Sequence, residues 1–556
     1  PAQINRRIYG YIQTKDATTV AKIFLFPMNS WHLYNHFENG KSAGGQIKYV
    51  RLFTLIGWII LIIACINFMN LATARSEHRA REVGIRKTLG SGRGKLVRQF
   101  ISEAMVMSLL STAVAILIVI LVLPAFNQLT GRTLEFRLFY LPHLAGLVAI
   151  ALVCGLAAGS YPAFYLSSFR PVKVLKGVRL SPKAGLIRKG LVITQFCVST
   201  ILIICTIIIF QQIRHGKDRD LGLDRQNLID VPLRGDMSSH FELLHQSLVS
   251  TGLVKDAALG ANEVFSLGSN GGGFSWPGKD PSKDVLITQE QVSPGYVKTL
   301  GMHLASGREF YPDAQTDSND IIINESLAHL MGKEGVVGHY LIRSSQRWRI
   351  IGILRDFVYN NMYQSARPLL LYCYPSLTNW LFVRFMPGID PERGIAAVRK
   401  VVRSEQPAYP FEYNFVDHQF DELFKSETLI GNLAAVFASL AVCISCLGLL
   451  GLAAFSAERR TREIGIRRVL GASLSGLMGL LSSEFLKLVA MACLAALPFS
   501  WWIMHNWLQS YEYRIKIQWW VFGATIIGAL GITLLTVSIQ AWRAAAMSPS
   551  KSLRTE

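Results

Sequence analysis

The chain alternates between long uncharged apolar runs and polar segments, and the apolar runs predict membrane helices. A run of about 20 residues without Asp, Glu, Lys or Arg can cross a hydrocarbon core of roughly 30 Å as a helix. A polar stretch over about 212–427 separates two groups of such runs and predicts a water-soluble domain. The predicted membrane helices cover residues 52–74, 104–126, 144–166, 190–211, 428–457, 488–507 and 518–541.

The polar domain contains short runs of β-branched and aromatic residues, which are typical of strands. Asp390 and Pro391 suit the N-cap and first position of a helix, and its apolar face would be Ile395, Val398, Val401 and Val402. We therefore predict a membrane protein with a mainly α-helical transmembrane bundle and a mixed α/β extracytoplasmic domain. The predicted strands of that domain are residues 227–233, 285–291, 348–354, 368–374 and 380–386.

A basic block occurs twice in the chain. Residues 77–103 and 458–484 align without a gap on Glu, Arg, Arg, Glu, Gly, Ile, Arg, Leu, Gly and a closing Ser-Glu. Each block follows one apolar run and precedes another, which predicts a duplicated membrane unit with the same element on one side of the bilayer. The singled-out positions are Arg79, Arg81, Glu82, Gly84, Ile85, Arg86, Lys87, Leu89 and Gly90 in the first block, and Arg460, Arg462, Glu463, Gly465, Ile466, Arg467, Arg468, Leu470 and Gly471 in the second.

Composition and charge support a membrane location and predict the orientation. Hydrophobic residues make up 51% of the 556 residues, and the formal net charge is +20. Lys and Arg are concentrated after the first, third, fifth and seventh runs, whereas the loops 127–141 and 508–517 hold few. Because basic residues resist transfer across the membrane, the repeated blocks are predicted to be cytoplasmic and the polar domain outside. Anionic membrane lipids account for the charge, so nucleic acid is not a predicted partner.

The sequence predicts no catalytic, cofactor or metal site in this chain. The segment 90–96 is rich in Gly and contains Gly94-Lys95, but Leu89 and Leu96 replace the Gly and the Ser or Thr of a Walker A loop. His32 and His36 have helical spacing without a clear third metal ligand. The apolar runs also lack ionisable residues near their centres, which disfavours an ion-coupled carrier. We therefore predict a non-enzymatic chain whose energy comes from another protein.

Two interpretations of the repeated block are open. On a helix, Val83 and Lys87 share one stripe, and Glu77 and Arg81 are spaced as a stabilising pair, as are the equivalent residues of the second block. Such a helix could simply lie at the membrane surface and set topology. Recurrence of the Glu and Gly positions at identical spacing favours the other interpretation, which is docking of a protein partner with two equivalent surfaces.

The block resembles the coupling segment of the FtsX-like and MacB-like permease family of ABC transporters, in its duplicated eight-helix form. The segment 66–74 before the first block is similar to the same family, and segments 295–310, 322–325 and 350–357 resemble its MacB-like periplasmic domain. Asn67 and Asn70 depart from the repeat, because the second half has Gly448 and Gly451 there. The two halves are therefore not expected to be interchangeable at that helix end.

The resemblance implies a domain organisation and a set of partners. Coupling helices would lie at about 79–90 and 460–471, and a cytoplasmic ABC ATPase dimer that binds ATP and Mg would dock on them. Membrane lipids and a periplasmic adaptor or outer-membrane channel are the other implied partners, at the bacterial inner membrane. The implied domains are a remnant of a first periplasmic domain (1–50), a first FtsX-like membrane unit (51–190), a linking helix (191–211), a MacB-like periplasmic domain (212–427) and a second FtsX-like unit (428–556).

The expected function is that of a permease subunit that couples ATP hydrolysis in a partner to conformational change outside the membrane. The expected outcome is export or extraction of a peptide, lipoprotein or macrolide-like substrate. An alternative is an ATP-driven activator or sensor that controls a periplasmic partner, such as a cell-wall hydrolase, without transport. Repeat symmetry also predicts a further apolar run and most of a first outer domain upstream of Pro1.

Overall fold

The computed structural model divides the chain into two compact units. The membrane unit consists of Pro1–Ile208, Leu429–Met504 and Ile517–Glu556, and the sheet unit consists of Ile209–Thr428 and His505–Lys516. The structure describes residues 2–15, 22–38, 41–89, 91–131, 133–137, 140–167, 182–280, 285–343, 346–360, 362–459, 463, 466–467, 469–470 and 472–545.

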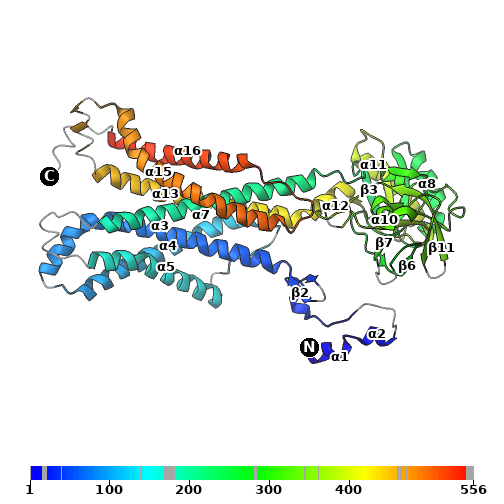
Figure 1. Ribbon diagram of the computed structural model, residues 1–556, viewed down its shortest axis with the longest axis horizontal. Coiled ribbons are helices and arrows are strands. Elements are labelled where there is room, and N and C mark those ends of the chain that lie inside the picture. The colour runs from blue at the N-terminus through cyan, green and yellow to red at the C-terminus, as the bar shows by residue number, and fades with distance from the viewer. Residues whose placement is uncertain are drawn as a thin grey trace. The chain divides into compact units, whose positions relative to one another are not determined.

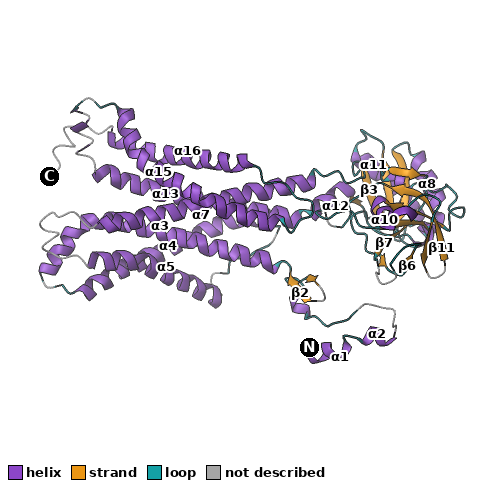
Figure 2. Ribbon diagram, viewed as in Figure 1, coloured by secondary structure: helices purple, strands orange, loops and turns teal. Residues whose placement is uncertain are grey.

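The predicted membrane runs are confirmed as helices. Among the described residues, seven helices are long and apolar enough to cross a membrane, and each contains one of the predicted runs. In the membrane unit these helices run alongside one another (Figures 1 and 2). They are α3 (Ile47–Thr88), α4 (Arg93–Thr130), α5 (Leu141–Ser167), α7 (Pro182–Lys217), α13 (Lys425–Arg459), α15 (Leu474–Leu508) and α16 (Trp519–Ala545).

The segment before α3 forms short elements of its own. Phe24 and Phe26 both contact the ring of Phe37, with centroids 5.3 and 5.0 Å apart, so a small aromatic cluster holds this segment together. Its elements are α1 (Ala2–Ile8), α2 (Tyr11–Lys15), the 3-10 turn η1 (Met28–Ser30), and the antiparallel strands β1 (His36–Glu38) and β2 (Lys41–Gly44).

Small residues allow the membrane helices to approach closely. A Cβ atom on Gly159 of α5 would lie 2.6 Å from the Cβ of Ala104 on α4, so only Gly fits there. Ser108 of α4 donates a hydrogen bond to the carbonyl oxygen of Ala151 at 2.7 Å. Close packing and interhelical hydrogen bonds replace the hydrophobic effect as the source of helix association inside a bilayer.

The sheet unit is built on a mixed sheet. Its strand order is β14-β3-β13-β4-β7-β12-β9-β11-β10-β6, with β5 beside β7 and β8 beside β11. The pairs β9/β11 and β7/β12 are parallel, and the others are antiparallel. The strands are β3 (Leu228–Pro232), β4 (Val254–Gly260), β5 (Asn270–Gly271), β6 (Phe274–Ser275), β7 (Ile287–Val292), β8 (Leu304–Gly307), β9 (Asp320–Asn324), β10 (Tyr340–Arg343), β11 (Gln346–Leu354), β12 (Leu369–Cys373), β13 (Trp380–Phe385) and β14 (Asn414–Phe415).

The predicted strands are confirmed as β3, β7, β11, β12 and β13, and the predicted helix as α11, so the fold is mixed α/β. Asp390 caps α11 by accepting a hydrogen bond from the Glu392 amide at 3.3 Å. The helices and 3-10 turns are η2 (Met237–His240), α8 (Phe241–Ser250), α9 (Tyr296–Thr299), α10 (Glu325–Met331), η3 (Gly332–Glu334), η4 (Pro375–Leu377), α11 (Pro391–Glu405) and α12 (Val416–Leu423).

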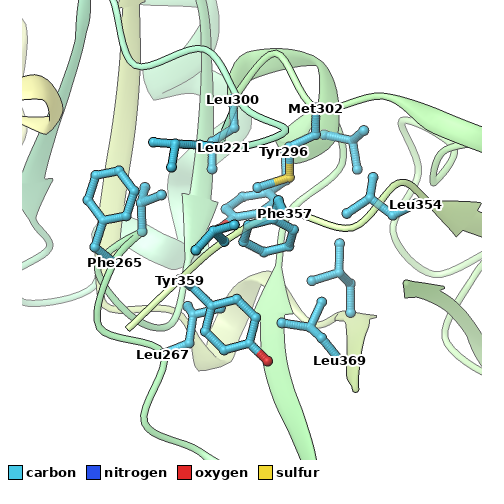
Figure 3. Close-up of a cluster of buried hydrophobic side chains, with 14 of the residues drawn as sticks. Leu221, Phe265, Leu267, Tyr296, Leu300, Met302, Leu354, Phe357, Tyr359 and Leu369 are labelled. Carbon is cyan, nitrogen blue, oxygen red and sulfur yellow. The ribbon is translucent and has the colours of Figure 1, made fainter. Parts of the chain in front are cut away.

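The hydrophobic core of the sheet unit lies on both sides of the sheet. One cluster joins β3, β4 and β13 to α8 and α11, through residues such as Leu248 and Val398. A second contains the rings of Tyr296 and Phe357, which Figure 3 shows close together among leucine side chains. A third includes Ile321, Ile350 and Leu370. Burial of side chains of this size contributes roughly 1.5–3 kcal/mol each, so these clusters are the main source of stability for the domain.

The loop between α15 and α16 also belongs to the sheet unit. Gln212 donates to the carbonyl oxygen of Tyr513 at 2.9 Å and accepts from the Ile515 amide at 3.0 Å. The Arg219 guanidinium lies over the Tyr513 ring, 4.3 Å from its centroid. Glu512 accepts a hydrogen bond from the Ser365 amide at 2.7 Å. No sequence pattern indicated these contacts, because they join residues far apart in the chain.

Candidate functional site

The first basic block spans the end of helix α3, which continues beyond the apolar span, and the start of α4. Val83 is buried, and the Lys87 ammonium on the same stripe donates to the carbonyl oxygen of Ser167 on α5 at 2.7 Å. Burial, together with the nearby positive charge of Arg93, lowers the pKa of Lys87. The stripe that contains Val83 and Lys87 therefore faces inward, toward α5 and the rest of the membrane unit.

The opposite side of the block is exposed. Ile85 and Leu89 are 51% and 82% exposed. Glu82 and Arg86 form an ion pair with 2.7 Å between Oε1 and the guanidinium nitrogen, and Arg86 also donates to Gln99 at 2.9 Å. The helix thus presents two apolar side chains beside a paired acid and base.

The second block repeats this arrangement. Ile466 and Leu470 are 52% and 80% exposed, which matches their counterparts in the first block. Glu463 and Arg467 form an ion pair at 2.8 Å. The Leu470 amide donates to the Ile466 carbonyl at 3.0 Å, the same distance as from Leu89 to Ile85. The molecule therefore carries two surfaces of equivalent chemistry and local geometry.

The sequence analysis did not predict the ion pairs Glu82–Arg86 and Glu463–Arg467. Their four-residue spacing in the sequence is a signal that could have found them. The expected pairs Glu77/Arg81 and Glu458/Arg462 involve side chains outside the described residues. The side chains of Arg79 and Arg81 are likewise outside the described residues, whereas Gly84 lies within α3. The remaining block positions are not described: Gly90, Arg460, Arg462, Gly465, Arg468 and Gly471.

The chemistry of the described block residues suits binding. Paired Glu and Arg side chains and exposed Ile and Leu side chains can be covered by a partner, but they include no nucleophile next to a base. Among the described residues, no group of three His, Cys, Asp or Glu side chains is placed to hold a metal ion.

Asp356 in the sheet unit has a structural role. Its carboxylate accepts hydrogen bonds from the Asn324 side chain at 2.7 Å and from the Ser326 amide and hydroxyl at 2.9 and 2.6 Å. Its amide donates to Glu325 at 3.0 Å. These bonds join the end of β11 to the start of α10, so Asp356 and the 322–325 segment hold the domain together.

Positions that are equivalent in the two halves meet in the membrane unit. A Cβ atom on Gly448 of α13 would lie 2.6 Å from Oδ1 of Asn67 on α3. A Cβ on Gly451 would lie 2.1 Å from Cδ2 of Leu71. Side chains of the first half therefore occupy the space left by glycines of the second. At Asn67 this complementarity accounts for the departure from the repeat, because a side chain at position 448 would overlap the Asn67 amide.

Comparison with known protein families finds two family models that match this chain. The model of the FtsX-like permease C-terminal domain matches the chain twice, at residues 54–171 and 435–549. The model of the MacB-like periplasmic core domain matches residues 202–401. Both repeated blocks lie inside the two FtsX-like matches.

Curated relatives match over part of their length. The pyoverdine export ATP-binding/permease protein PvdT of Pseudomonas putida is 32% identical over 134 residues, which is 24% of this chain and 20% of that protein. The macrolide export ATP-binding/permease protein MacB of Sodalis glossinidius is 27% identical over 130 residues, 23% of this chain and 20% of that protein. The matches thus span about a fifth of the length of these relatives.

Solved structures of two periplasmic or extracellular domains are also similar. The periplasmic region of MacB from Actinobacillus actinomycetemcomitans has 12% identity and a TM-score of 0.27, covering 36% of this chain and 94% of that one. The extracellular domain of YknZ from Gram-positive bacteria has 15% identity and a TM-score of 0.25, covering 34% and 98%. With two FtsX-like matches on either side of a MacB-like match in the sequence, the chain is a multi-pass member of the FtsX-like and MacB-like permease family.

Proposed function

We propose that the chain is the permease subunit of a bacterial inner-membrane ABC transporter. A separate cytoplasmic ATPase dimer would bind ATP and Mg and dock on the two repeated blocks. Its ATP-driven closure would change the conformation of the periplasmic domain and so export or extract a peptide, a lipoprotein or a macrolide-like molecule. The observation that carries the proposal is the pair of matched exposed surfaces at Ile85/Leu89 and Ile466/Leu470.

The chemistry of these surfaces supports a protein partner over lipid alone. Exposed Leu and Ile side chains next to charged residues are typical of the centre and rim of a protein interface. A lipid-facing helix needs no matched acid–base pair, yet Glu82–Arg86 and Glu463–Arg467 recur with nearly the same distance. Two equivalent surfaces on one chain fit a dimeric partner, because each subunit of the dimer can then bind one of them in the same way.

Movement at the blocks would be passed to the rest of the chain by continuous helices. Helix α3 joins the first block to the apolar span without a break, from Ile47 to Thr88. In the second half, α13 leads toward the second block and ends at Arg459. Since a helix resists compression along its axis, displacement of a block would move the attached membrane helix.

The printed names of the relatives support the choice of an export system. PvdT is named for pyoverdine export and MacB for macrolide export, and both names combine ATP-binding and permease functions. The 556 residues of this chain contain no Walker A sequence. We therefore assign ATP binding to a partner chain and propose an amphiphilic substrate of the same general kind.

Copurification with the ATPase tests the docking role. The tagged protein would be isolated from its own host in mild detergent, and the bound ATPase identified by mass spectrometry. We expect Leu89→Asp combined with Leu470→Asp to abolish recovery of the ATPase, because each change places a charge in the apolar centre of a surface. Leu186→Asp is the matched control, since Leu186 on α7 is an exposed leucine outside both blocks. Full recovery of the ATPase with the double variant would refute docking at these surfaces.

A further inference from the structure

A group of amide side chains is buried where α3, α7 and α13 meet. Asn70 and Gln195 are only 1% and 2% exposed. Asn67 Oδ1, both polar side-chain atoms of Asn70 and Gln195 Nε2 are buried and have no hydrogen-bond partner among the described residues. The membrane unit thus has four unpaired polar atoms close to the contact between its two halves.

Two of these atoms, from Asn67 and Gln195, lie close to Gly448. The point where a Cβ atom would stand on Gly448 lies 2.6 Å from Oδ1 of Asn67 and 3.4 Å from Nε2 of Gln195. An acceptor from α3 and a donor from α7 therefore face the same place on α13, and the two groups make no hydrogen bond to each other. One turn away, Ser199 and Ser445 are fully paired, with their hydroxyl oxygens 2.9 Å apart.

An unpaired amide is expensive inside a membrane. A buried polar group without a hydrogen bond costs roughly 2–7 kcal/mol, and the bilayer core supplies no partner. Buried water typically makes about three hydrogen bonds to such groups. Asn67 Oδ1 can accept from water and Gln195 Nε2 can donate to it, whereas the neutral amides offer no charge for an ion.

We propose that Asn67, Asn70 and Gln195 form a water-binding site between the two halves of the membrane unit. Water held between Asn67 Oδ1 and Gln195 Nε2, beside Gly448, bridges α3 and α7. Asn70, one turn from Asn67 on α3, supplies a further donor and acceptor. The inference is independent of the proposed ATPase partner. Because bridging water can exchange its hydrogen bonds, α3 can shift against α13 without leaving an amide unpaired. A dry interface of the same shape would resist that shift.

A double-mutant cycle tests the site. The variants are Asn67→Leu, Gln195→Leu and the combination, in the full chain in detergent, with thermal unfolding as the readout. Water that bridges the two amides predicts that each single change destabilises the protein, because it leaves the other amide less well satisfied. The double change should then restore stability, giving a coupling that is clearly non-additive. Additive changes, or single changes that each raise the melting temperature, would overturn the proposal.

Radiolytic oxidation in native membranes gives a second test, which measures access of water instead of thermal stability. Hydroxyl radicals form where water is present, so Met69, next to Asn70, should be oxidised in the unaltered protein. The double variant should slow oxidation of Met69 severalfold. Gly531→Ala is the control, because a Cβ there meets nothing within 4 Å. Oxidation of Met69 that the double variant leaves unchanged would refute the water site.

Discussion

Gly307 in the sheet unit shows why one residue of the family-like segments has to be glycine. Its φ is +82°, and a Cβ atom there would lie 2.2 Å from the carbonyl oxygen of Ile351. The next residue, Arg308, binds the carboxylate of Asp317 through two nitrogens at 2.7 and 2.9 Å. The turn after β8 therefore depends on the absence of a side chain at Gly307 and on the ion pair between Arg308 and Asp317.

Gly307→Ala is expected to destabilise the protein strongly. The added methyl group meets backbone, which cannot move aside as a flexible side chain would, and the positive φ adds strain of order 1 kcal/mol or more. We expect a loss of at least about 2 kcal/mol in the free energy of unfolding, measured by denaturant titration in detergent. Gly388→Ala is the control, with φ +79° and nothing within 4 Å of the new Cβ. If both variants lost the same stability, close approach to Ile351 would not be the cause.

Glu290 makes the stability of the sheet unit depend on pH. Glu290 is fully buried, and burial raises its pKa to about 7. The hydrogen bonds from Asn262 at 2.8 and 2.7 Å favour the charged form and act in the opposite direction, but their effect on the pKa is smaller. A folded pKa above the unfolded value means that the stabilising contribution is complete below about pH 4.5 and is lost as the pH rises through 7.

Glu290→Gln should therefore flatten the dependence of stability on pH. The variant cannot lose a proton, so the fall in the free energy of unfolding between about pH 4.5 and 7 should become smaller by up to about 3 kcal/mol. The burial of Asp230, which raises its pKa to about 6, leaves a smaller slope of the same sign. The measurement is the melting temperature of both proteins across this range. Parallel curves would show that Glu290 does not carry the effect.

At the scale of elements, the contact between α3 and α13 depends on side chains of different size. Leu71 fills the space over Gly451, and the rings of Phe53 and Phe437 meet farther along the same helices with centroids 5.8 Å apart. The alignment of the two blocks already placed Asn67 opposite Gly448 in the repeat. It could not show that these two positions touch, because a repeat gives equivalence and not distance.

Gly451→Ala should separate these helices, since the new methyl group would overlap Cδ2 of Leu71. We expect a loss of about 1–3 kcal/mol, as for overpacking elsewhere. The double variant with Leu71→Ala should recover part of the lost stability, because removal of the Leu71 side-chain end makes room for the new methyl group. Thermal unfolding of the two singles and the double measures this coupling. Gly528→Ala on α16, where a Cβ meets nothing within 4 Å, is the control.

The sequence predicted elements well where the signal is local. The apolar runs and the strands β3, β7, β11, β12 and β13 were found because composition and periodicity act over a few residues. Strand β4 was missed, since Val254–Gly260 contains Lys, Asp and Ala with little alternation. Helical spacing placed Val83 and Lys87 on one stripe, but it did not show that this stripe faces inward. The acceptor of Lys87 on Ser167 is 80 residues away and had no sequence signal.

At the scale of the whole molecule, the matched surfaces imply that both halves contribute equally to binding the proposed ATPase. Leu89→Asp alone and Leu470→Asp alone should weaken binding by a similar factor, about tenfold each, because the exposed fractions of the two leucines differ by little. Titration of purified ATPase against each variant measures the factor. A loss confined to one variant would show that the two surfaces have diverged in function.

The loop His505–Lys516 also decides how the periplasmic domain can be studied by itself. Arg219, Gln212 and Ser365 all bind residues of this loop, which begins 77 residues after the end of the domain's main segment at Thr428. A fragment cut at the flanking helices would keep the sheet but lose those partners, and the Tyr363 ring would lose its neighbour Tyr511. Recombinant versions intended for crystallisation or binding assays should therefore carry the loop as an added peptide.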